Sequence, residues 1–126
     1  MLRLPAFDLL EPTSLDEALQ LLAEHGGDAM PIAGGTDLLP NMKHELFTPR
    51  VLVSLTGIQS LRAIEDLGDA WRLGAGCALN QLATHPDLQA SLPALTEALG
   101  AVGGPHHRRM GTLGGNLCLD TRCLYY

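Results

Sequence analysis

Two glycine-rich segments hold the residues whose types and spacing could do chemistry. Residues 32–39 read IAGGTDLL, and residues 111–116 read GTLGGN. Glycine lets a backbone approach a ligand closely and adopt positive φ, so consecutive N–H groups can converge on an anion. The two segments are therefore predicted to hold a diphosphate from both sides.

Each segment also has an ordinary explanation as a tight turn. Neither carries the G-x-G-x-x-G or G-K-[ST] spacing of common nucleotide-binding motifs. The first still suits phosphate, because Thr36 and Asp37 open a predicted helix whose N-terminal N–H groups and dipole favour an anion. The second adds the Thr112 hydroxyl and the Asn116 amide as donors. The occurrence of both, each at the edge of a predicted strand, favours a ligand site.

The remaining polar residues give weaker signals. Residues 106–109 (HHRR) form the basic cluster of the chain, which either offsets ligand charge or lies on a solvated turn. His25, His44 and His85 stand singly on predicted helical stretches and are interpreted as surface residues. The spacings support no Ser-His-Asp or Cys-His arrangement.

Composition narrows the class of protein. The chain has 126 residues, of which 46% are hydrophobic, and a formal net charge of −6. The acidic balance argues against nucleic acid or an anionic membrane as a partner. No apolar stretch is long enough for a membrane span, and Pro5 interrupts the N-terminus too early for a secretory segment, so we expect a cytoplasmic protein. Three cysteines without an export signal favour reduced thiols over a disulfide framework.

The first 57 residues read as strand-helix-strand-helix-strand. Strands are predicted at residues 6–10, 29–33 and 51–55, with a second helix from Asp37 to about Leu46. The first helix begins at Ser14, which forms a capping box with Glu17, and ends at Gly26-Gly27. Its predicted apolar stripe consists of Leu15, Ala18, Leu19, Leu22 and Ala23.

The pattern changes at residue 58, where we expect a second lobe, 58–126, to follow the first lobe, 1–57. Residues 61–65 and 71–74 alternate like the strands of a hairpin. Helices are predicted at 80–84, 86–90 and 93–102, the last ending at Gly103-Gly104. The fold class is therefore α+β.

Taken together, residues 32–39 and 112–116 resemble the FAD-binding subunit of the molybdenum hydroxylases, the xanthine dehydrogenase and carbon monoxide dehydrogenase family. The resemblance implies a two-lobed FAD-binding domain of the molybdopterin dehydrogenase (PCMH-like) type, with the second lobe incomplete. It implies FAD contacts at Ala33, Gly34, Gly35, Thr36, Asp37, Leu38, Val102, Thr112, Leu113, Gly114, Gly115 and Asn116. No catalytic acid, base or nucleophile is expected, because flavin chemistry belongs to the cofactor.

Residues 116–123 (NLCLDTRC) followed by two tyrosines are most similar to the beta subunit of 4-hydroxybenzoyl-CoA reductase. That similarity implies that Cys123 is a ligand of a [4Fe-4S] cluster in a full-length protein only, because no cysteine follows it here to complete a four-thiolate set. Cys118 is interpreted as a small buried residue beside the flavin loop.

The resemblance implies an electron relay between iron–sulfur centres and an external donor or acceptor. Its partners would be a large molybdopterin-binding subunit and a small iron–sulfur subunit. Tyr125 and Tyr126 end the sequence without a helix stop or polar tail, so we expect a truncated chain that binds flavin weakly or not at all and is inactive alone. The alternative is a non-catalytic α+β module that binds a protein partner and no flavin.

Overall fold

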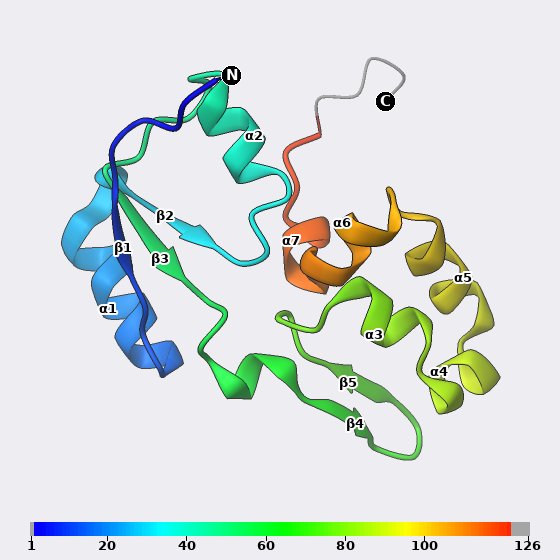
Figure 1. Cartoon of the computed structure of the whole chain (residues 1–126). Coiled ribbons are helices and arrows are strands. Elements are labelled where there is room, and N and C mark those ends of the chain that lie inside the picture. The colour runs from blue at the N-terminus through cyan, green and yellow to red at the C-terminus, as the bar shows by residue number, and fades with distance from the viewer. Residues whose placement is uncertain (1, 122–126) are drawn as a thin grey trace.

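The chain places helices around two small β-sheets (Figure 1). The computed structural model describes residues 2–121. The strands are β1 (Asp8–Leu10), β2 (Ala29–Ile32), β3 (Val51–Ser54), β4 (Ile64–Asp66) and β5 (Trp71–Leu73). The helices are α1 (Leu15–His25), α2 (Leu38–Lys43), α3 (Leu79–Ala83), α4 (Pro86–Ser91), α5 (Pro93–Ala101), α6 (Pro105–Met110) and α7 (Leu113–Leu117), with short 3-10 turns at Gly26–Asp28 and Gln59–Arg62.

The first sheet is parallel, with the order β1-β3-β2. All four residues of β3 are buried, as expected for a central strand rich in valine and leucine. Pro31 is tolerated because β2 lies at an edge, where a strand can do without one N–H. A hydrophobic cluster joins this sheet to α1 and consists of Ala18, Val51, Val53 and Ile58.

Helix α1 begins as predicted but buries less of its apolar stripe. The Ser14 hydroxyl oxygen accepts a hydrogen bond from the Glu17 N–H at 3.2 Å, and Glu17 accepts one from the Thr13 N–H at 2.9 Å. Within the predicted stripe, Leu15 and Leu19 are 44% and 56% exposed. A sheet of three strands, each of three or four residues, is too narrow to cover five stripe positions.

The second sheet is the antiparallel hairpin β4-β5, with Gly68 at φ +87° in its turn. Its first strand starts later than predicted, because residues 59–62 form a 3-10 turn. Helices α3, α4 and α5 follow, and a second hydrophobic cluster contains Cys77, Leu79, Leu82, Leu88 and Leu99. The lobe boundary between residues 57 and 58 stays a prediction; Ile58 itself packs in the first cluster.

Two local predictions were wrong. His85 was expected at the surface, but its ring lies edge-on to Trp71 with centroids 5.9 Å apart, and its Nδ1 is buried. His85 stands at the N-cap of α4, directly before Pro86, and there its ring reaches Trp71 of β5. Residues 106–109 form most of α6 rather than a connecting segment, because Pro105 at the first helical position starts a helix.

The Cys77 thiol gives the second cluster a dependence on pH. Burial raises the pKa of this thiol above its ordinary value of 9.0, and a Gly74 hydrogen bond and the Arg62 charge offset part of the shift. The folded chain therefore holds a proton that the unfolded chain loses. The contribution of the protonated Cys77 thiol to the free energy of unfolding is complete below about pH 9 and falls as the pH rises further.

We predict that urea unfolding measured from about pH 8 to pH 10 shows a smaller loss of stability in Cys77→Ala than in the wild type. The free energy of unfolding of this variant should be lower at every pH, because the side chain is smaller. Cys118→Ala, which removes an exposed thiol, should keep the wild-type slope. Equal slopes for Cys77→Ala and the wild type would contradict the assignment.

Candidate functional site

Both glycine-rich segments line one cavity of about 790 Å³. It lies where the loop after β2 approaches α6 and α7 (Figure 1). Volumes of about 300–1,000 Å³ are typical of small-molecule and cofactor sites. The predicted contact residues that line the cavity are Ala33, Gly34, Gly35, Thr36, Asp37, Leu38, Val102, Thr112, Gly114, Gly115 and Asn116.

Leu113 is the predicted contact residue that does not line this cavity. Its side chain packs against the second hydrophobic cluster instead. Leu113 is the first residue of α7, and its side chain anchors this helix to the core.

The two segments touch through their backbones. A Cβ built on Gly34 would fall on the carbonyl oxygen of Met110, directly before Gly111. Gly35 follows with φ +69°, a conformation that favours glycine. Gly34 in the first half of the chain is therefore in direct contact with Met110 and Gly111 in the second half.

The first segment keeps its backbone donors available. Within residues 2–121, no acceptor pairs with the N–H groups of Gly34, Gly35 and Thr36. Asp37 stands at the N-cap of α2, but its backbone is already helical (φ −104°, ψ −50°) and its side chain makes no capping hydrogen bond. The second helix, expected from Asp37, thus begins at Leu38 without a side-chain cap, and Gly34, Gly35 and Thr36 all line the cavity.

Five backbone N–H groups of the second segment already have acceptors, whereas the Thr112 N–H has none within residues 2–121. The N–H groups of Leu113 and Gly114 donate to the carbonyls of Cys77 (2.9 Å) and Ala75 (2.8 Å). Those of Gly115 and Asn116 donate to the Thr112 hydroxyl (3.2 Å) and carbonyl (3.1 Å).

This geometry corrects the expected position of the second segment. It opens the short helix α7 and touches residue 78 through one isolated bridge, rather than standing at a strand edge. The donors that it can offer to a ligand are the Thr112 N–H, the Thr112 hydroxyl proton and the second N–H of the Asn116 carboxamide, whose Nδ2 already donates to the Thr112 carbonyl at 3.1 Å.

Three basic side chains line the cavity, Arg62, His107 and Arg109, together with the carboxylates of Asp37 and Asp120. The predicted basic cluster thus contributes two of its four members. Sequence analysis missed Arg62, which also donates to the Thr56 carbonyl at 2.6 Å. Arg62 is held near the site by residues 74–76, because Gly74 and Gly76 pack against the backbone of Leu61. The sequence GAG at these positions was the pattern that could have indicated this close approach.

The cysteine predictions have different outcomes. Cys118 is exposed, so its interpretation as a buried residue was wrong; α7 ends just before it. Cys123 and the two tyrosines lie outside the described residues. Within residues 2–121, no three His, Cys, Asp or Glu side chains form a group that could hold a metal ion. None of the helices in this part of the chain has the length and apolar character needed to cross a membrane.

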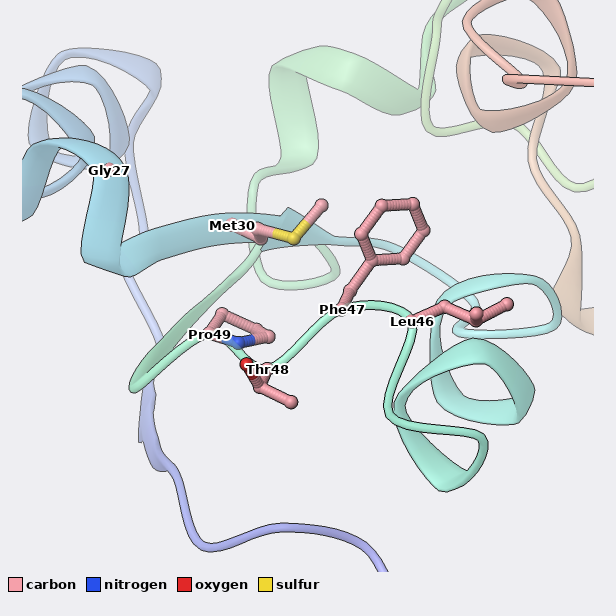
Figure 2. A pocket seen from close by; sticks show the side chains of 6 residues that line it. All are labelled: Gly27, Met30, Leu46, Phe47, Thr48 and Pro49. Carbon is pink, nitrogen blue, oxygen red and sulfur yellow. The ribbon is translucent and has the colours of Figure 1, made fainter.

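A second hollow, of about 260 Å³, lies beside the outer strand β2 (Figure 2). It is lined by Gly27, Met30, Leu46, Phe47, Thr48 and Pro49. Met30 and Phe47 also line the larger cavity and so separate the two spaces. The small hollow carries no charged side chain, and nothing in its lining indicates chemistry.

The Gly34 contact leads to a stability prediction. Gly34→Ala should lower the free energy of unfolding by about 1–3 kcal/mol, because the added methyl group forces the Met110 carbonyl away. Gly100→Ala is the matched control, since a Cβ there meets open space within α5 and should stabilise the helix by up to about 1 kcal/mol. Urea unfolding measures both. A wild-type midpoint for Gly34→Ala would contradict the tight approach.

Known proteins share this arrangement. Residues 5–123 match the family described as the FAD binding domain in molybdopterin dehydrogenase. The chain is 39% identical over 113 residues to the carbon monoxide dehydrogenase medium chain of Hydrogenophaga pseudoflava, covering 90% of this chain and 39% of that one. It is 35% identical over 106 residues to the xanthine dehydrogenase FAD-binding subunit of Escherichia coli O157:H7, covering 83% and 36% of the two chains.

A solved structure of carbon monoxide dehydrogenase from Hydrogenophaga pseudoflava superposes on the chain with a TM-score of 0.89 at 38% identity, covering 91% of this chain and 40% of that one. The chain thus spans about two-fifths of the length of these relatives. The predicted resemblance, the α+β fold class and FAD as the family's cofactor are confirmed. From the joined glycine segments and the match along nearly all of its residues, the chain belongs to the FAD-binding domain family of the molybdopterin dehydrogenases.

Proposed function

We propose that the cavity between the two glycine segments binds the diphosphate of FAD. The observation that carries the proposal is the row of unpaired N–H groups at Gly34, Gly35 and Thr36, which border this cavity. Backbone donors held in a fixed loop suit phosphate oxygens, because charge-assisted hydrogen bonds are shorter and stronger than neutral ones. The residues present therefore fit the cofactor of the family.

The two segments would bind the diphosphate through different kinds of donor group. The first offers backbone N–H groups, whereas the second offers the Thr112 N–H and hydroxyl and the Asn116 carboxamide, because the N–H groups of residues 113–116 are already paired. Arg62 and Arg109 line the same cavity, as do the carboxylates Asp37 and Asp120, and the two arginines supply positive charge there in a chain whose net charge is −6. This charge offsets that of a diphosphate.

The role of the whole protein follows from its cofactor. Bound FAD supplies electron transfer, while the protein residues hold and orient it. We propose that the protein relays electrons between iron–sulfur centres and an external donor or acceptor, together with a large molybdopterin-binding subunit and a small iron–sulfur subunit. The names of its relatives, a medium chain and a FAD-binding subunit, support this assignment.

The substrate of the holoenzyme is set outside this site. The two relatives named above are components of dehydrogenases for carbon monoxide and for xanthine, although both match the same segment of this chain. A cavity shared by enzymes with such different substrates serves the cofactor that they have in common. The similarity of residues 116–123 to 4-hydroxybenzoyl-CoA reductase stays a prediction.

Gly35→Val tests the diphosphate site. We expect at least a tenfold loss of FAD affinity, because a side chain at φ +69° strains the loop and its Cβ would stand 2.9 Å from Leu39 Cδ1. Quenching of flavin fluorescence on titration measures the affinity, and the visible absorption spectrum shows whether flavin stays with the purified chain.

Gly68→Val is the matched control. Gly68 also has positive φ (+87°), but it lies in the hairpin turn with nothing within 4 Å of an added Cβ. The variant carries a similar backbone strain away from the cavity and should retain wild-type FAD affinity. Equal affinities for the two variants would refute the diphosphate assignment. A full-length protein that takes up no flavin would favour the alternative of a flavin-free interaction module.

A further inference from the structure

Arg108 differs from the basic residues around it. It is half-buried, whereas His106, His107 and Arg109 are exposed. Its Nη1 donates to the Gly103 carbonyl at 2.7 Å and to the Val102 carbonyl at 3.1 Å. Hydrogen bonds from a charged donor are about twice as strong as neutral ones. The Arg108 guanidinium therefore binds the backbone of residues 102 and 103.

The two carbonyls belong to the turn between α5 and α6. Helix α5 ends at Ala101, and Gly103 has φ +49°. The Gly104 N–H donates to His107 Nδ1 at 3.4 Å, and the Arg108 N–H donates to the Gly104 carbonyl at 3.1 Å. A helix of six residues is too short to be stable by itself. The Arg108 guanidinium therefore fixes the angle at which α6 leaves α5.

That angle decides where the second glycine segment meets the first. Helix α6 ends at Met110, whose carbonyl packs on Gly34. Gly111 is buried; its N–H donates to the His107 carbonyl at 2.6 Å, and its carbonyl accepts from the Leu79 N–H at 3.0 Å. Rotation of α6 would move the Met110 carbonyl and Gly111 together and so change the distance between the two glycine segments.

We infer that Arg108 is a positioning residue of the diphosphate site, acting through the turn at residues 102–104 and through α6. The inference rests on the proposed function. Within the described chain, Val102 and Arg109 line the cavity and Arg108 does not. Arg108 thus sets the distance between the two glycine segments without contacting the ligand.

The test compares Arg108→Met, Arg108→Lys and the control Arg72→Met. Amide hydrogen exchange without FAD reports on the turn, and flavin fluorescence titration reports on affinity. For Arg108→Met we expect faster exchange confined to residues 103–111 and about tenfold weaker FAD binding. Arg108→Lys should recover part of both, because an ammonium group lacks the planar fork that reaches two carbonyls.

The control removes an arginine of similar chemistry elsewhere. Arg72 pairs with Glu65 at 2.8 Å on the exposed hairpin, so Arg72→Met should match the wild type in both measurements. Wild-type exchange or wild-type affinity in Arg108→Met would overturn the inference. Faster exchange throughout α3 and α5 would also overturn it, because Arg108 would then support the whole second cluster.

The two proposals fail in different ways. If the full-length wild-type protein binds no FAD, the proposed function is contradicted, and the role of Arg108 at a diphosphate site falls with it. Exchange at residues 103–111 still decides whether Arg108 holds the turn. If the wild type binds FAD and Arg108→Met binds it equally well, the function stands and the positioning role is wrong.

Discussion

The contact on which the site depends contains no side chain. The backbone of Gly34 lies against the carbonyl of Met110, and any larger residue at position 34 would occupy the same space. This approach brings the end of an edge strand in the first sheet to the end of a six-residue helix in the second half of the chain. Close packing leaves no slack for it, because protein interiors are as dense as organic crystals. The elements on either side must therefore hold Gly34 and the Met110 carbonyl at this short separation.

Different forces hold the two sides in place. The first segment follows a parallel sheet whose central strand is fully buried, so hydrophobic packing sets its position. The second is short of apolar anchors apart from Leu113, and backbone hydrogen bonds to residues 75–79 fix it instead. The consequence is a division between donors. The N–H groups of Gly34, Gly35 and Thr36 remain available, whereas those of residues 113–116 hold the second segment in place.

Sequence could predict the features that depend on local chemistry. The three parallel strands, the Ser14 cap and the hairpin follow from periodicity and turn residues, and both glycine segments proved to line one cavity. Features set by tertiary packing were missed. The exposure of Leu15 and Leu19 depends on the width of the sheet, and the burial of His85 on where Trp71 lies. The internal pairing of the N–H groups at residues 113–116 depends on residues far away in the sequence, so no local pattern could reveal it.

Residues 2–121 contain two separate hydrophobic clusters, and the large cavity is lined from both halves of the chain. A ligand that contacts both halves stabilises the folded arrangement in proportion to the logarithm of its concentration. It also couples the two clusters, since opening either one releases the ligand. The supply of such a ligand therefore governs how cooperatively the chain unfolds, and with it how long the chain resists proteases.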